Sequence, residues 1–287
     1  TELPLRVEGG RIYCPGVGDN TACLVCLLLA GKYIAGYVDS PRWREIRGEN
    51  APGLLLVCNA GEEGLGNLKG VHKICEDYGD RMERFCTFDS SLSSIVDRAV
   101  GSKRFRVRVR TRGGHSYNNF GNDNAIACLA SLVGELYGIR VPEGGKTTYN
   151  VGMISGGTSV NTIAQEAEML YEFRSDRREN LEYMERQFMK VIDRGKSEGM
   201  DVSLEIIGVR PCEGPVDPKR KQALSDWAHR VVEEMTGQAP KHCAGSTDCN
   251  IPLSLGIPSV CVGSFRGAGA HTREEYVETD SLEEGYK

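Results

Sequence analysis

The segment that most constrains the fold is a continuous apolar run, Gly53–Ala60, which ends in the glycine-rich loop Gly61–Gly66. A bounded apolar run of this length is typical of a buried parallel strand. The loop would then lie at the carboxyl end of that strand, where open α/β sheets place their binding sites. It carries two adjacent carboxylates, Glu62 and Glu63. Side-by-side negative charges are unfavourable unless a cation or a shared proton compensates, so the pair predicts a functional site rather than an exposed acidic turn.

Composition sets the broad class of protein. The chain has 287 residues, 40% of them hydrophobic, which is enough for one large or two medium domains. Its net charge of −5 argues against nucleic acid or an anionic membrane as the main partner. The 11 cysteines are scattered and odd in number, which favours a reducing, cytoplasmic location over a disulfide scaffold. We expect no membrane span, because no uninterrupted apolar run reaches about 18–20 residues, and no signal peptide opens the chain.

An α/β pattern is expected in two separated parts of the chain, residues 1–102 and 213–287, which would form one discontinuous metal-binding catalytic domain. The expected helices and strands in these parts alternate, as they do in α/β domains. The helices are predicted at 21–33, 68–78 and 220–235, and the strands at 53–60, 85–88 and 257–262.

Between these parts, residues 103–212 show a different pattern of hydrophobic and polar residues. Hydrophobic and polar residues alternate strictly along the run Phe105–Arg112. This predicts a half-buried antiparallel strand with Arg106, Arg108 and Arg110 on its solvent-exposed face. In an acidic chain, a solvated strand face is favoured over a nucleic-acid patch. The elements that follow are a helix at 122–137, strands at 147–154 and 166–173, a helix at 178–196 and a strand at 201–209. The order β-α-β-β-α-β predicts an inserted ferredoxin-like domain.

Candidate metal ligands follow the predicted strands of the catalytic part. Asp19 lies in a turn before an apolar helix, Asp89 follows the strand at 85–88, and His271 comes after the strand at 257–262. With Glu62 and Glu63 they form a set of four carboxylates and one imidazole. Such a set suits zinc or manganese, and four carboxylates in one crevice would repel one another without about two dications among them.

Five motifs occur in an order that resembles the di-zinc exopeptidase and deacylase family, which includes glutamate carboxypeptidase, peptidase T, acetylornithine deacetylase and aminoacylase. They are Gly18-Asp-Asn20, Gly61-Glu-Glu-Gly64, Gly114-His-Ser116, Asn161 before a strand ending in Phe173-Arg-Ser-Asp176, and Ala270-His-Thr-Arg-Glu-Glu-Tyr276. The resemblance implies a zinc-exopeptidase-like mixed-sheet catalytic domain with an inserted ferredoxin-like βαββαβ dimerisation, or lid, domain.

The resemblance also implies roles for single residues. Asp19 would bridge two zinc ions, Glu63 and His271 would complete one of them, and Asp89 would help to bind the other. Glu62 would be the general base that takes a proton from the attacking water. The substrate carbonyl or carboxylate would be bound by residues of the inserted domain, with His115 reaching the partner subunit's site; these residues are His115, Asn161 and Arg174.

The implied activity is hydrolysis of an amide bond in a small peptide or an N-acyl amino acid by a homodimer that binds zinc, with cobalt or manganese as alternatives. Two other functions are open to argument. A nucleotide-binding turn at 61–66 is disfavoured, because Glu62 and Glu63 would stand where a pyrophosphate approaches the backbone amides. The stronger alternative is a catalytically impaired homologue that acts as a dimeric small-molecule-binding module.

That alternative rests on one departure from the family pattern. The family has a His-x-Asp motif upstream of the bridging aspartate, but only 18 residues precede Asp19 and none is histidine. The other histidines do not fit this motif either: His72 and His229 lie in predicted helices, and His242 lies just before the loop at 244. The last residues, 281–287, resemble the start of a helix. We therefore expect an incomplete chain that holds one zinc ion or none.

Overall fold

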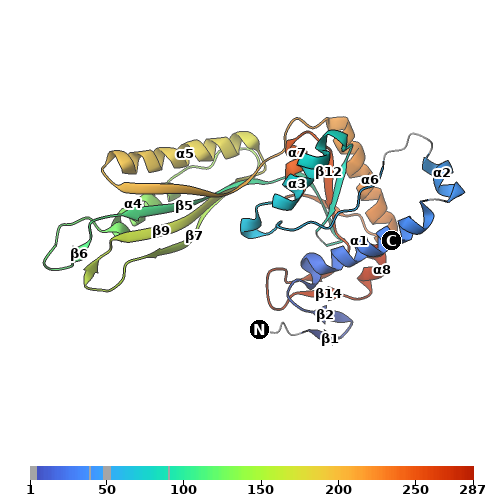
Figure 1. The fold of residues 1–287 in the computed structure, drawn as a ribbon, viewed down its shortest axis with the longest axis horizontal. Helices are drawn as coiled ribbons and strands as arrows, with labels where there is room; N and C mark the ends of the chain where they lie inside the picture. Colours follow the sequence, from blue (N-terminus) through green and yellow to red (C-terminus); the bar gives the residue numbers. More distant parts are fainter. Residues whose placement is uncertain (1–4, 39, 48–52, 90) are drawn as a thin grey trace. The chain divides into compact units, whose positions relative to one another are not determined.

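The computed structural model describes residues 5–38, 40–47, 53–89 and 91–287 (Figure 1). The chain divides into two compact units. The first contains Thr1–Glu62, Leu68–Arg98 and Pro215–Lys287, and the second contains Glu63–Asn67 and Ala99–Gly214. The sequence predicts an inserted domain at 103–212, and most of the second unit is this segment.

The second unit is an antiparallel sheet with two helices against one face (Figure 1). The strand order is β10-β5-β9-β7, and every neighbouring pair is antiparallel. The predicted β-α-β-β-α-β order is therefore confirmed. Its elements are β5 (Gly101–Arg110), α4 (Ala125–Tyr137), β7 (Thr147–Gly156), β9 (Glu166–Ser175), α5 (Arg178–Ser197) and β10 (Asp201–Arg210), with the short pair β6 (Gly114–His115) and β8 (Thr162–Ile163).

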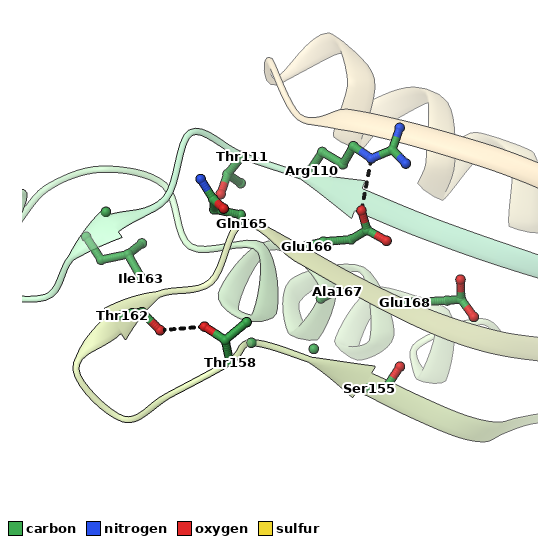
Figure 2. Close-up of a pocket in the computed structure, with 13 residues that line it drawn as sticks. Arg110, Thr111, Ser155, Thr158, Thr162, Ile163, Gln165, Glu166, Ala167 and Glu168 are labelled. Carbon is green, nitrogen blue, oxygen red and sulfur yellow. Dashed lines mark hydrogen bonds and ion pairs between the residues drawn. The ribbon is translucent and has the colours of Figure 1, made fainter.

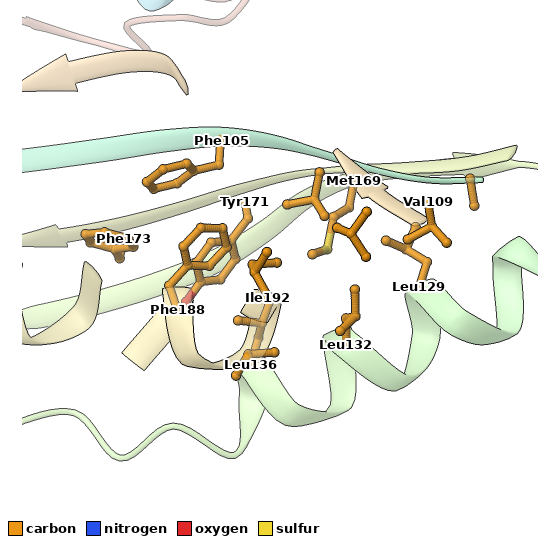
Figure 3. Close-up of a cluster of buried hydrophobic side chains, with 14 of the residues drawn as sticks. Phe105, Val109, Leu129, Leu132, Leu136, Met169, Tyr171, Phe173, Phe188 and Ile192 are labelled. Atoms are coloured by element: carbon orange, nitrogen blue, oxygen red, sulfur yellow. The ribbon is translucent and has the colours of Figure 1, made fainter. Parts of the chain in front are cut away.

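Aromatic side chains fill the space between this sheet and its helices (Figure 3). The ring of Phe188 on α5 stacks on Phe105 with centroids 4.4 Å apart and on Tyr171 with centroids 5.2 Å apart. Leu129 and Leu136 of α4 are fully buried in the same cluster. Rings of this size bury large apolar areas, so the second unit has a hydrophobic core of its own.

The opposite face of this sheet carries the predicted row of arginines. Each arginine contacts a glutamate on a neighbouring strand: Arg106 Nη1 lies 2.7 Å from Glu205, Arg108 Nη2 2.6 Å from Glu168, and Arg110 Nε 3.1 Å from Glu166. Cross-strand pairs of opposite charge stabilise a solvated sheet face. Because each arginine pairs with a glutamate, the row forms an ionic ladder across the sheet.

The first unit contains a mixed sheet with the order β11-β4-β12-β3. Strand β12 is parallel to β3 and antiparallel to β4, which confirms the mixed sheet implied by the family resemblance. Helix α6 packs Leu224, Ala228 and Val232 onto this sheet. The elements are β3 (Phe85–Phe88), β4 (Ser94–Ala99), α6 (Pro218–Thr236), β11 (Lys241–Gly245) and β12 (Ser259–Val262), with helices α2 (Pro41–Arg47), α3 (Lys69–Tyr78) and α7 (Asn250–Ser254).

A second small sheet joins the amino-terminal and carboxyl-terminal parts of the first unit. Its order is β1-β2-β14-β13, and Tyr13 on β2 pairs with Tyr276 on β14. This pairing brings the turn that carries Asp19 close to the loop that carries His271. The elements are β1 (Arg6–Glu8), β2 (Arg11–Tyr13), β13 (Gly267–Ala268) and β14 (Tyr276–Glu278), followed by α8 (Ser281–Tyr286).

The prediction of a buried parallel strand at 53–60 is wrong for the described structure. The segment is extended but belongs to none of the sheets, and Leu54 and Leu55 are 61% and 52% exposed. One side does pack on the first helix: a Cβ built at Gly31 would stand 2.7 Å from Leu56 Cδ1. An apolar strand is buried only when other strands flank it, and the residues that the structure describes supply none here.

The helix predicted at 21–33, an apolar stretch long enough for a buried helix, is present as α1 (Cys23–Tyr37), but much of it is exposed. Leu28 and Tyr33 are 56% and 57% exposed. With the turn before it, Val17–Tyr37 is the one helix in the described part of the chain that is long and apolar enough to cross a membrane, by length and composition alone. The core helix of a soluble protein passes the same test, so this is weak evidence for a span.

Candidate metal centre

The turn that carries Asp19 is held by a buried carboxylate. Glu275 is 3% exposed, and its two oxygens accept hydrogen bonds from the backbone N–H groups of Gly16 (2.7 Å), Gly18 (2.9 Å) and Asp19 (2.8 Å). The turn also requires glycine at position 18, because a Cβ atom there would lie 2.7 Å from the ring of Phe265. Glu275 therefore fixes the backbone from which Asp19 projects.

Asp19 and His271 are in direct contact. Asp19 Oδ2 lies 2.8 Å from His271 Nε2, with the carboxylate 19% exposed and the imidazole 69% exposed. His271 lies in the loop between β13 and β14 and has a left-handed backbone, φ 65°. A non-glycine residue in this conformation is uncommon, and such residues are found at functional sites more often than elsewhere.

Glu63 completes a cluster of three. One ligand atom from each of Asp19, Glu63 and His271 lies within 4.8 Å of the other two. Glu63 follows Glu62 directly, and the backbone just after it is held by a 2.7 Å hydrogen bond from Arg104 Nη1 to Gly64 O. Two carboxylates and one imidazole form a donor set that a zinc ion accepts.

Asp89 is tethered to this region through Asn20. The amide of Asn20 donates to Phe88 O at 2.8 Å and to Asp89 Oδ1 at 3.0 Å, so the residue after Asp19 binds the residue after β3. Among the described residues, the three-ligand cluster includes neither Asp89 nor Glu62. Glu62 is half-buried in the loop after Gly61. The φ of Gly61, 81°, turns the chain at the end of the segment 53–60.

His115 and Asn161 lie together in the second unit. Strands β6 and β8 pair His115 with Thr162, and Ser116 N donates to Asn161 O at 3.0 Å. The Nδ1 atom of His115 faces the backbone N–H groups of Tyr117 (3.3 Å) and Asn118 (3.4 Å). These contacts hold the ring by its Nδ1 atom.

A cleft of about 810 Å³ in the second unit adjoins this pair (Figure 2). Gly114 precedes His115, Thr162 follows Asn161, and both line the cleft. Its walls carry hydroxyl, amide and charged groups, and Thr158 and Thr162 are joined by a 3.1 Å hydrogen bond across it. Apolar groups, among them Ile163 and Ala167, share the lining with these polar ones.

Arg174 is not part of that group. It lies near the other end of β9, opposite Ser102 on β5, and its Nε atom donates to Glu172 at 2.9 Å. Burial alone would raise the pKa of Glu172, but hydrogen bonds and ion pairs with Arg174 and Arg104 outweigh burial and lower the pKa. The structure thus gives Arg174 a carboxylate partner within its own sheet.

This arrangement predicts an acid-sensitive contribution to stability. A carboxylate whose pKa is lowered on folding stabilises the protein above its unfolded pKa, near 4.5, and the contribution disappears as the pH falls through the folded pKa. We expect Glu172→Gln to lower the free energy of unfolding at pH 7 by less than about 1 kcal/mol, because the pair is partly screened by solvent. Urea unfolding at neutral pH and at about pH 3 measures this. A deficit that persists unchanged in acid would contradict it.

Comparison with known proteins finds one family model that matches part of the chain and relatives that cover both units. Residues 99–200 match the family model M20_dimer, the peptidase dimerisation domain. A succinyl-diaminopimelate desuccinylase of Nitrosospira multiformis is 23% identical over 292 residues, which is 96% of this chain and 72% of that protein. A homologue of a p-aminobenzoyl-glutamate hydrolase chain, from Haemophilus influenzae, is 31% identical over 202 residues, which is 63% of this chain and 48% of that protein.

Solved structures share the fold. A tripeptidase from Staphylococcus aureus has a TM-score of 0.76 at 21% identity, and the aminopeptidase PepT from Bacillus cereus has a TM-score of 0.71 at 20% identity. In both cases the match covers 99% of this chain and 74% of the other. The fold is that of a hydrolase with an inserted dimerisation domain. Over most of its length the chain resembles metallopeptidases and deacylases of the M20 type, and its inserted domain matches their dimerisation domain.

Two positioning residues were missed by the sequence reasoning. Glu275 and Asn20 both lie inside motifs that carry the family resemblance, but neither was given a role. A signal was present for Glu275, because it is one of two adjacent acidic residues, Glu274 and Glu275, placed shortly after His271. Only the structure shows that one of them is buried under the Asp19 turn while the other is exposed.

Proposed function

We propose that this chain is a hydrolase of the M20 type that cleaves an amide bond in a small peptide or an N-acyl amino acid, with a divalent metal at the Asp19 centre. The observation that carries the proposal is the cluster of Asp19, Glu63 and His271, with ligand atoms within 4.8 Å of one another. The names of the relatives support the substrate class, because they refer to a desuccinylase, an aminobenzoyl-glutamate hydrolase and a tripeptidase.

Zinc suits the donor set best, and Asp19, Glu63 and His271 would hold it. Asp89, tethered through Asn20, would share a second ion with Asp19. When bound, a divalent ion polarises a substrate carbonyl and lowers the pKa of bound water to about 7.

We assign general acid–base catalysis to Glu62. Its carboxylate accepts a proton from the attacking water and then donates that proton to the leaving amine nitrogen. For this role Glu62 must remain off the metal, so we assign ligation to Glu63 and proton transfer to Glu62. Glu275 keeps the Asp19 turn in place while the charges at the site change.

Substrate binding is assigned to the second unit. His115 and Asn161 would donate hydrogen bonds to the carbonyl or the terminal carboxylate, and Arg174 would supply a positive charge once Glu172 is displaced or shared. A homodimer is proposed on the match to the dimerisation domain, with His115 acting at the partner subunit's site. A concentration-independent monomer in sedimentation experiments would contradict this part.

The test is turnover by the full chain. The protein is supplied with zinc, cobalt or manganese and assayed against dipeptides, tripeptides, N-acetyl amino acids and N-succinyl amino acids. Release of free amine that depends on metal and is abolished by His271→Gln supports the proposal. If the chain binds such compounds in calorimetry but releases no product with any metal, the alternative of a dimeric binding module holds instead.

The donor count predicts the metal stoichiometry. The described residues offer one three-ligand cluster, and Asp89 stands outside it, so a second ion would have fewer anchors and would be repelled across Asp19. We expect at most one zinc ion per chain to survive extensive dialysis, and none in His271→Gln. Elemental analysis of the dialysed protein measures this. Two zinc ions retained per chain would contradict this expectation.

A further inference from the structure

A second group of metal-binding side chains lies in the first unit, away from the Asp19 centre. His229 on α6 and His242 on β11 stack with ring centroids 5.2 Å apart and an angle of 9° between the rings. His229 Nδ1 and His242 Nε2 are 2.9 Å apart. The two side chains are 31% and 35% exposed, so solvent ions can reach them.

Each imidazole has a carboxylate on its other nitrogen. Asp97 Oδ2 on β4 lies 2.6 Å from His242 Nδ1, and the same oxygen accepts a 2.8 Å hydrogen bond from Ser225 Oγ. Glu233 Oε2, one helical turn after His229, lies 3.8 Å from His229 Nε2. A carboxylate accepts but does not donate, so Asp97 favours the His242 tautomer with its proton on Nδ1. The Glu233 contact is too long for a hydrogen bond, so this carboxylate acts on His229 through its charge alone.

This arrangement leaves the lone pair of His242 Nε2 facing His229 Nδ1, 2.9 Å away. Without a metal ion, a proton on His229 Nδ1 joins the two nitrogens. In the other tautomer of His229 both facing nitrogens are acceptors, and a metal ion can take the place of that proton between them. The carboxylates of Asp97 and Glu233 supply the compensating negative charge.

We propose that His229 and His242 form a surface site for a first-row transition metal ion such as Zn²⁺, Ni²⁺ or Cu²⁺, completed by solvent. Imidazole nitrogen selects these ions over Mg²⁺ and Ca²⁺. Carboxylate–histidine–metal arrays orient the ring and raise its basicity, which is the role assigned here to Asp97. Metal–nitrogen bonds of about 2.0–2.1 Å require the two nitrogens to separate to about 3.3 Å, a small movement for exposed rings. The bound ion would join α6 to the edge strand β11.

The experiment is a zinc titration of the full chain followed by calorimetry, with variants that separate this site from the Asp19 centre. We expect His229→Gln and His242→Gln each to lose one class of weaker binding with at least a tenfold fall in affinity, and His271→Gln to lose the tighter class instead. Asp97→Asn should weaken the surface site by about 10- to 100-fold without removing either ligand. His72→Gln, an exposed histidine on α3, is the matched control and should bind as the parent does.

A spectroscopic readout covers the case in which a surface variant fails to fold. Cu²⁺ added to His271→Gln should give an electron paramagnetic resonance spectrum with coupling to two imidazole nitrogens. Superimposable titrations of His229→Gln, His242→Gln and His72→Gln, or a copper spectrum without imidazole coupling, would overturn the proposal and leave a pair of rings that share a proton.

Discussion

Replacing Glu62 by glutamine is expected to lower kcat by roughly 10²- to 10⁴-fold while leaving the metal content unchanged. Glutamine keeps the size of the side chain and its capacity to hydrogen-bond, but it cannot accept the proton of the attacking water. The loop geometry should survive, because Glu62 is half-buried next to Gly61 and no part of the Glu275 anchor depends on it. Steady-state kinetics, together with elemental analysis of the same preparation, measure both quantities.

The matched control is the neighbouring carboxylate. Glu63→Gln should lose the metal and, as a result, the activity, because Glu63 belongs to the cluster with Asp19 and His271. The two variants therefore separate proton transfer from ligation at adjacent positions. If Glu62→Gln loses the metal and Glu63→Gln keeps it, the two roles have been assigned the wrong way round.

Replacing Glu275 by alanine is expected to reduce the free energy of unfolding of the first unit by about 3 kcal/mol or more. The carboxylate accepts three backbone N–H groups in a buried position, and alanine would leave those donors without an acceptor. A buried polar group without a partner costs about 1–3 kcal/mol. The same change should weaken metal binding, because the Asp19 backbone is one of the three donors. Urea unfolding and zinc titration test the two effects.

Glu274 provides the control for that experiment. It is also a glutamate and is adjacent in sequence, but its side chain is 78% exposed and contacts Arg6 at 3.1 Å on the surface. Glu274→Ala should leave both stability and metal affinity close to those of the parent. Equal losses in the two variants would show that net charge in this loop matters rather than the buried anchor.

The contrast between the two units shows what can be predicted from sequence. In the second unit the strict alternation of 105–112 and the order of its elements predicted the ferredoxin-like fold, because each strand and helix packs against elements of the same continuous segment. In the first unit the run 53–60 predicted burial, but burial depends on which strands lie beside the run. The short edge strand β11 was missed because Lys241–Gly245 contains no β-branched residue.

For the candidate site, sequence alone pointed to the charged residues and not to what holds them. Asp19, Glu63 and His271 could be singled out because each lies in or beside a glycine-containing turn within a recognisable motif. Their supports could not, because a buried carboxylate such as Glu275 is distinguished from an exposed one only by the chain packed over it. The contact of Arg174 with Glu172 could likewise not be predicted from sequence, since it depends on which side chains share one face of β9.

The exposed apolar side chains of the first unit affect how the oligomeric state is measured. Leu54, Leu55 and Leu28 present hydrocarbon to water, and such surfaces associate weakly with many apolar molecules. Copies of the chain, chaperones and detergent monomers would compete for the same side chains. Association of this kind keeps growing as the protein is concentrated and fades in mild detergent, whereas a specific two-fold contact saturates. Only a titration over a wide range of concentrations would distinguish a dimer from a weakly associating monomer.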